Sequence, residues 1–311
     1  MVEPVADTGH RPVLLEETLA ALAIRGEGVY VDCTFGRGGH ASQLLRRLGK
    51  GGRLVAIDRD PQAVALARTM AEADPRLSVH HGAFDRLQSF VEQLQLHGGI
   101  DGVLFDLGVS SPQLDDVSRG FSFMRDGPLD MRMDSSCGQT AAEWIAHASE
   151  RDIADCLHRY GEERHARRIA RAIVAARRER PIATTGQLAE IAARAHPDWR
   201  HGQHPATRTF QAIRILINDE LNILKRGLLQ ALDVLAVGGR LLVISFHSLE
   251  DRIVKQFMRR EAGKTDGVSR LPAAHVARLR IIGKAIRPSG DEVAGNPRAR
   301  SAVLRVAEKL A

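Results

Sequence analysis

Cysteines, long apolar runs and an export signal are scarce or absent in this 311-residue sequence, and each scarcity excludes a class of protein. Three scattered cysteines (Cys33, Cys137 and Cys156) form neither a disulfide framework nor a four-ligand zinc site by themselves. No apolar run approaches the roughly 20 residues that a membrane-spanning helix requires. The N-terminus carries acids and prolines where an export signal needs a basic flank and an apolar stretch. We therefore expect a soluble, cytoplasmic protein with no membrane partner.

The composition is that of a globular chain with a small basic surplus. Charged residues make up 26% and hydrophobic residues 44%, which excludes a disordered or fibrous protein. There are 44 lysines and arginines against 38 acidic residues, so the formal net charge is +6. A surplus of this size is compatible with a polyanionic partner without establishing one.

Short apolar runs alternate with helical patterns over the first third of the chain. Strands are expected at residues 29–33, 54–57, 77–80 and 102–105, with helices beginning near His40, Pro61 and Arg86. This alternation predicts a doubly wound parallel α/β sheet with helices on both faces. Further strands are expected at 240–245, 281–286 and 303–306, preceded by one long helix at 206–235.

The strand pattern is interrupted after the fourth strand. Residues 112–203 contain several helical patterns and no run that is typical of a buried strand. We therefore predict a discontinuous sheet domain, residues 1–111 and 204–311, with an all-helical domain inserted at 112–203. Residues 263–277 lack periodicity and predict a mobile loop.

A glycine-rich turn with the sequence TFGRGGH follows the first strand, at residues 34–40. Glycines permit positive φ and a close approach of the backbone to a ligand, and the next helix offers free N–H groups. Asp58 ends the second strand about 20 residues later, where a carboxylate commonly accepts hydrogen bonds from ribose hydroxyls. Residues 36–41 also fit the GxGxxA dinucleotide fingerprint, so an NAD-dependent oxidoreductase and a purely structural turn both stay open.

Asp32 ends the first strand and bears on the choice of cofactor. Its carboxylate would attract the ammonium group of S-adenosylmethionine and repel a pyrophosphate. The same side chain is equally suited to capping the glycine turn, so both interpretations stay open.

Several motifs occur in consistent order along nearly the whole chain. They are GRGGH (36–40), DRDP (58–61), DLGVSSPQ (106–113), RGFSF (119–123), YGEE (160–163), HPATR (204–208), SFHSLEDR (245–252) and NPRARS (296–301). With these motifs the chain resembles the bacterial RsmH (MraW) family. The resemblance implies a class I S-adenosylmethionine-dependent methyltransferase fold with an inserted helical domain that recognises RNA. It further implies methylation of the exocyclic N4 of a cytosine in the decoding centre of 16S rRNA, within the small ribosomal subunit.

The family's cofactor contacts carry over by motif onto this sequence. With Asp32 and Gly36 from the analysis above, the expected S-adenosylmethionine site comprises Asp32, Gly36, Gly38, Gly39, His40, Asp58, Phe84, Asp106 and Gln113. A non-catalytic RNA-binding protein would leave the acids at the ends of strands one, two and four unexplained. Whether the substrate is free RNA or an assembled subunit stays open, as does a homo-oligomeric state.

Cytosine N4 is a poor nucleophile because its lone pair is conjugated into the ring. Hydrogen-bond acceptors for its N–H groups and correct positioning supply much of the rate enhancement. The candidate acceptors are Asp106, Ser110 and Ser111 after the fourth strand, unless Asp106 contacts only the cofactor. Methylation at C5 would need a thiolate, and no cysteine ends the fourth or fifth strand.

Three groups of residues are candidates for contact with RNA. Arg164, Arg168 and Arg171 lie near one face of a helix predicted at 163–179. Either they contact RNA phosphates, or they form an ordinary solvated face without a ligand. Phe246 and His247 could stack on the target base, unless they are an ordinary packing phenylalanine and a satisfied histidine. Phe121 and Phe123, beside Arg119, form the third group.

No dedicated metal site is expected. Asp126, Asp130 and Asp134 are four residues apart, but Pro128 opposes the helix that would align them. His201 and His204 have no thiolate partners nearby in the sequence.

Overall fold

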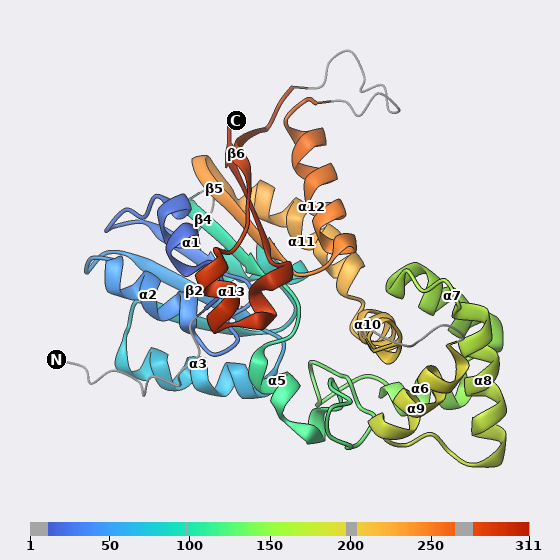
Figure 1. The fold of residues 1–311 in the computed structure, drawn as a ribbon. Coiled ribbons are helices and arrows are strands. Elements are labelled where there is room, and N and C mark those ends of the chain that lie inside the picture. The colour runs from blue at the N-terminus through green and yellow to red at the C-terminus, as the bar shows by residue number, and fades with distance from the viewer. Residues whose placement is uncertain (1–11, 97–98, 197–203, 265–275, 311) are drawn as a thin grey trace. The chain divides into compact units, whose positions relative to one another are not determined.

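The computed structural model describes residues 12–96, 99–196, 204–264 and 276–310, so His201 and most of the predicted loop at 263–277 lie outside the described residues. Seven strands form one sheet in the order β3-β2-β1-β4-β5-β7-β6. Figure 1 shows this sheet with helices packed around it. The strands are β1 (Val29–Asp32), β2 (Arg53–Asp58), β3 (Leu77–His81), β4 (Ile100–Asp106), β5 (Leu235–Ser245), β6 (Leu279–Ile286) and β7 (Val303–Lys309).

Strands β1 to β5 pair in parallel, whereas β7 is antiparallel to both β5 and β6. This order with one reversed strand is that of class I methyltransferases, so the predicted fold class is confirmed. Each strand expected from the sequence is present, including the weak one at 281–286.

The pairing register places three carboxylates at one edge of the sheet. Asp32 pairs with Ala56 of β2 and with Leu104 of β4, so Asp58 and Asp106 each lie two residues beyond it. Because β1 lies between β2 and β4, the three aspartates end adjacent strands at the carboxyl edge. This is the edge at which ligands bind in open α/β sheets.

Helices cover both faces of the sheet. Apolar side chains of α4, α11 and α12 pack on one face, and those of α1, α2 and α3 pack on the other. The helices of this unit are α1 (Leu15–Leu22), α2 (Gly39–Arg47), α3 (Pro61–Ala73), η1 (Phe84–Arg86), α4 (Leu87–Gln93), α11 (Glu220–Val234), α12 (Ser248–Glu261), α13 (Gly290–Gly295) and η3 (Pro297–Ser301).

The chain divides into two compact units, residues 1–108 with 221–311, and residues 109–220. The second unit is helical and has its own apolar core. Its helices are α5 (Ser111–Asp115), η2 (Val117–Arg119), α6 (Ala141–His147), α7 (Glu150–Gly161), α8 (Ala166–Glu179), α9 (Thr185–Ala195) and α10 (Ala206–Ile217). The helical unit extends beyond the expected limits of 112–203 because α10 packs against α6, α7 and α9.

The single long helix expected at 206–235 is wrong. The chain forms α10 and α11, separated at Asn218 and Asp219, and Asp219 has a φ of 48°. The Asn218 amide donates to the carbonyl oxygen of Met131 at 2.7 Å and accepts from the Met133 N–H at 2.8 Å. These long-range hydrogen bonds satisfy a buried side chain at the helix break, which no local pattern specifies. Among the described residues, no helix is both long and apolar enough to cross a membrane.

Candidate active site

The glycine turn between β1 and α2 brings the backbone close to its neighbours. Gly36 and Gly38 have φ values of 56° and 75°, which glycine adopts without a Cβ penalty. A Cβ at Gly39 would lie 2.3 Å from Cγ of Pro12, so this position has no space for a side chain. The turn therefore requires glycine for both backbone conformation and packing.

Asp58 holds the turn from the end of β2. Its Oδ2 accepts the Gly36 N–H at 2.7 Å, and its Oδ1 accepts the Asp60 N–H at 2.8 Å. Burial raises the pKa of the Asp58 carboxyl, against the lowering effect of these N–H donors. Each carboxylate oxygen can accept a second hydrogen bond, so the holding role is compatible with binding a ribose.

Asp32, His40 and Asp106 form a buried titratable cluster. Asp32 is 1% exposed, and burial raises its pKa to about 6 although nearby His40 lowers it. His40 Nε2 lies 3.6 Å from Asp106 Oδ2, an ion-pair separation longer than a hydrogen bond. Burial lowers the pKa of His40, but Asp106 and Asp32 outweigh burial, so the net pKa is raised.

Several polar atoms of this cluster lack partners. Both ring nitrogens of His40 and Oδ1 of Asp106 are buried without a hydrogen-bond partner among the described residues. Buried polar groups are usually paired, so such a group of orphans is typical of a site that binds a ligand. Thr34 fixes the end of β4 beside it, since its Oγ1 accepts the Asp106 N–H at 2.6 Å.

Phe84 supplies an apolar wall in the same unit. Its ring meets that of Phe105 edge-on, with the centroids 5.1 Å apart. A Cβ at Gly227 in α11 would lie 2.6 Å from Phe84 Cδ2, so the small residue of α11 makes room for the ring. The sequence indicated Phe84 only through resemblance, because its packing partner is more than a hundred residues away.

The cluster favours a cationic ligand. Asp32, Asp58 and Asp106 end adjacent strands, and Asp32 and Asp106 also act on the buried His40 imidazole. A bound cation is therefore stabilised there and a pyrophosphate is repelled. The geometry is therefore a better match to a sulfonium cofactor carrying an ammonium group than to a dinucleotide.

Comparison with known proteins places this arrangement in a family. Residues 7–310 match the MraW methylase family. The chain belongs to that family. It is 57% identical over 98% of its length to ribosomal RNA small subunit methyltransferase H of Chromohalobacter salexigens, of which 93% is covered. It is 54% identical over 97% of its length to the protein of the same name from Pseudoalteromonas atlantica, of which 98% is covered. A solved rRNA methylase from Streptococcus thermophilus gives a TM-score of 0.44 at 12% identity, covering 97% of this chain and 98% of that chain.

Three predicted site residues of this MraW methylase lie in its helical unit. Ser110 caps α5, with its N–H donating to Oε1 of Gln113 at 2.9 Å, and Ser111 is the first residue of that helix. Gln113 is 8% exposed and completes the capping box. These contacts fix the start of α5, and the predicted cofactor and catalytic roles of the three residues stay predictions.

Phe246 and His247 follow β5 and are held by a residue that the sequence analysis missed. The buried Glu250 carboxylate accepts the Phe246 N–H at 2.9 Å and the His247 N–H at 3.3 Å. His247 also caps α12, because its Nδ1 accepts the Glu250 N–H at 3.4 Å. The spacing of histidine and glutamate at helix positions N-cap and N3 is a capping-box signal. Both residues are half-buried. Packing and helix capping therefore explain much of where they lie, and stacking on the target base stays a prediction.

In the third group of RNA candidates, Arg119 and Phe121 are buried, whereas Phe123 is half-buried. Arg119 and Phe121 are each 6% exposed, and Arg119 donates to the carbonyl oxygen of Met133 at 2.8 Å. Phe123 packs on Phe210, with the ring centroids 4.9 Å apart. Phe121 thus belongs to the core of the helical unit and Phe123 packs against that core. The burial of Arg119 and Phe121 opposes the predicted surface there, and the RNA contact of Phe123 stays a prediction.

The arginine stripe is exposed as predicted. Arg168 and Arg171 project from α8, whose opposite face buries Ile169 and Ile173. Helix α8 begins at Ala166 rather than at residue 163, so Arg164 lies in the segment before it and is also exposed.

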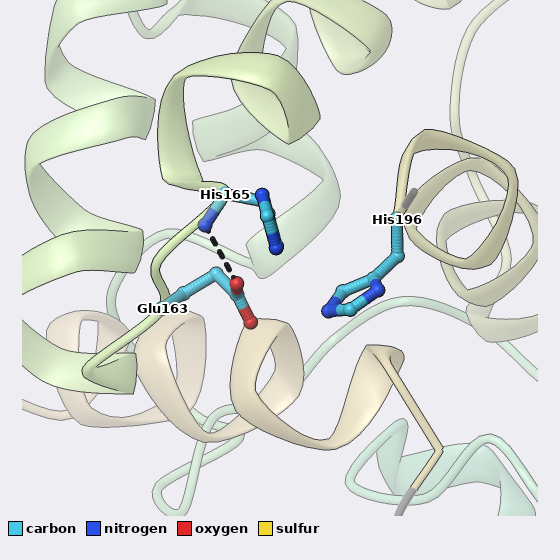
Figure 2. A group of neighbouring side chains, drawn as sticks. All are labelled: Glu163, His165 and His196. Carbon is cyan, nitrogen blue, oxygen red and sulfur yellow. Dashed lines mark hydrogen bonds between the residues drawn. The ribbon is translucent and has the colours of Figure 1, made fainter. Parts of the chain in front are cut away.

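Figure 2 shows a grouping that the sequence spacing did not indicate. One ligand atom each of Glu163, His165 and His196 lies within 4.8 Å of the others, and the three side chains point toward one another. The buried Glu163 carboxylate accepts the His165 N–H at 2.8 Å beside the start of α8, where a negative charge is favourable. Glu163 thus has a backbone partner of its own just before α8, and the expectation of no dedicated metal site stays a prediction.

The aspartates considered for a metal each have a partner of their own. Asp126 accepts the Gly186 N–H at 2.7 Å, and Asp130 pairs with Arg132 at 2.8 Å. Asp134 accepts the Ser136 N–H at 2.9 Å. His204 stacks on Phe123 at 4.8 Å between ring centroids.

Proposed function

We propose that this chain transfers a methyl group from S-adenosylmethionine to the exocyclic N4 of a cytosine in the decoding centre of 16S rRNA. The observation that carries the proposal is the grouping of Asp32, Asp58 and Asp106 at adjacent strand ends, with His40 beside Asp32 and Asp106. The full-length relatives named ribosomal RNA small subunit methyltransferase H support the substrate class. Cytoplasmic action on this RNA is part of the proposal.

S-adenosylmethionine supplies an activated methyl group on a positively charged sulfur when it is bound. Asp32 attracts its ammonium group, and Asp58 accepts hydrogen bonds from its ribose hydroxyls. The backbone at Gly36, Gly38 and Gly39 makes room for close approach, and Phe84 offers an apolar surface. An NAD-dependent oxidoreductase is disfavoured, since the same carboxylates repel a pyrophosphate.

Asp106 is the group best suited to the target amine. Its Oδ1 has no hydrogen-bond partner among the described residues, and its side chain is 26% exposed. A hydrogen bond from cytosine N4 to the Asp106 carboxylate favours pyramidal nitrogen and directs its lone pair at the methyl group. We keep Ser110 and Ser111 as further candidate acceptors.

The proposal is tested by mapping methyl groups on 16S rRNA from cells that lack the protein. The wild-type gene restores N4-methylcytosine in the decoding centre, whereas Asp106→Asn lowers methyl transfer by about 100-fold. Asp115→Asn, an exposed acid of α5, serves as the control and restores the mark. An unchanged methylation pattern in the deletion strain would refute the substrate. Calorimetry with NAD and with S-adenosylmethionine separates the two cofactors.

A further inference from the structure

A basic groove lies at the outer edge of the sheet, away from the residues assigned above. It has a volume of about 420 Å³ and lies between α12 and the edge strand β6. Its apolar lining includes Met258, Ile281 and Val306. The charged residues that line it are all basic, namely Lys255, Arg259, Lys264, Lys284 and Arg305.

An irregularity in β6 shapes the groove. Ile282 pairs with Val306 and Ile286 pairs with Leu304, so residues 283–285 oppose Arg305 alone. Gly283 has a φ of 66° and open space where a Cβ would be. Such bulges at sheet edges redirect side chains, and this one presents Lys284 at the groove.

The positive charge of the groove is only partly neutralised. Arg305 pairs with Asp251 at 2.7 Å. Lys255, Lys264 and Lys284 are exposed and have no carboxylate partner among the described residues. Three free ammonium groups around an apolar floor are complementary to a phosphodiester chain whose riboses contact the floor.

The register places the groove beside the strands that carry the candidate active site. Its β7 residues Arg305 and Val306 lie opposite Val243 and Leu242 of β5. These in turn lie opposite Phe105 and Leu104, one and two residues before Asp106. Three strand spacings of about 4.8 Å separate β6 from β4, so the β6 side of the groove is roughly 14 Å from β4. Both lie in one compact unit of the chain.

We propose that the α12–β6 groove binds the RNA backbone of nucleotides flanking the target cytosine. This rests on the proposed function, because the bound RNA is the substrate. Lysines act as point charges rather than as planar forks, so the groove positions the strand without reading its sequence. It is a second RNA surface, separate from the arginine stripe of α8.

The test compares Lys255→Ala/Lys284→Ala with wild type, using a 16S rRNA fragment that carries the decoding centre and, as a second probe, small subunits from cells lacking the protein. Loss of two phosphate contacts reduces the slope of log K against log salt by about 1.4 and weakens binding about tenfold at physiological salt. KM for RNA rises while kcat stays unchanged. The affinity for S-adenosylmethionine stays unchanged.

Lys50→Ala/Arg53→Ala is the matched control. It removes the same charge from the same unit at two exposed positions outside the groove, Lys50 before β2 and Arg53 at the start of β2. An unchanged salt slope in the groove variant, or an equal loss in the control, would overturn the proposal, as would a wild type that binds neither probe. A wild type that binds RNA through these lysines without methylating it would leave the groove proposal standing and refute the proposed function.

Discussion

Asp32 is a residue whose burial lowers the stability of the free protein while favouring the binding of a cationic ligand. It is buried at the end of β1, where burial raises its pKa from an ordinary 3.8 to about 6. The folded protein therefore retains a proton that the unfolded chain has already lost between these two pH values. Stability accordingly falls as the pH rises from about 4 to about 6. A cationic ligand bound at this carboxylate offsets the free-energy cost of burying its negative charge.

Asp32→Asn is expected to stabilise the free protein and to weaken cofactor binding. At pH 7 the variant avoids burying a charge, so its free energy of unfolding rises by up to about 3 kcal/mol, whereas near pH 3 the two proteins are alike. Urea unfolding across this pH range measures the difference.

The same variant is also expected to change how cofactor affinity depends on pH. Wild-type affinity for S-adenosylmethionine falls as the pH drops below about 6 because Asp32 becomes protonated, and Asp32→Asn removes this dependence and binds at least about tenfold more weakly. Calorimetric titration at several pH values measures both effects. A variant that binds the cofactor as tightly as wild type at pH 7 would exclude the ammonium contact.

At the scale of elements, helix α8 has a buried apolar face and an exposed basic face. Ile169 and Ile173 are fully buried in the core of the helical unit, while Arg168 and Arg171 project outward. Arg171 of this stripe pairs with Glu150 at 3.9 Å, both side chains are well exposed, and such surface pairs contribute little to stability. The arginines are thus available for phosphate contact.

Arg168→Glu/Arg171→Glu is expected to weaken RNA binding about tenfold or more, because two phosphate contacts become repulsive. Cofactor affinity and folding stay unchanged. Filter binding to 16S rRNA and calorimetry with S-adenosylmethionine measure the two quantities. Arg151→Glu/Arg194→Glu changes the charge of the same unit equally at exposed positions of α7 and α9, and serves as the control. Equal loss of RNA and cofactor binding would indicate a structural defect instead.

At the scale of the whole molecule, two kinds of electrostatics operate. Under the proposed function, a buried cluster of carboxylates binds one small cation, whereas the exposed cations on α8 and along the α12–β6 groove contact a polyanion. Screening by salt acts strongly on exposed charges and weakly on buried ones. The two substrates should therefore respond differently to ionic strength.

Raising the salt concentration is expected to reduce kcat/KM for RNA steeply while leaving the affinity for S-adenosylmethionine within about twofold. Five or more phosphate contacts give a slope of about −3.5 or steeper on a double logarithmic plot. Methyl transfer at saturating cofactor measures the slope. A flat profile would mean that few phosphates are contacted.

The sequence by itself determined the sheet and the chemistry of its edge. Apolar runs, the glycine turn and Pro61 at the start of α3 are local signals, so strands, turn and helices followed from neighbouring residues. Asp32, Asp58 and Asp106 each end a strand, and parallel pairing alone brings such ends together. That is why the acidic edge could be predicted without coordinates.

Only the tertiary structure decided which side chains are buried and which distant residues meet. Asn218 breaks the expected long helix by bonding to Met131, 87 residues away, and Arg119 lies in a core instead of on a surface. The bulge that opens the α12–β6 groove depends on register with β7. Burial and long-range hydrogen bonds are properties of the packed chain, so no local pattern contains them.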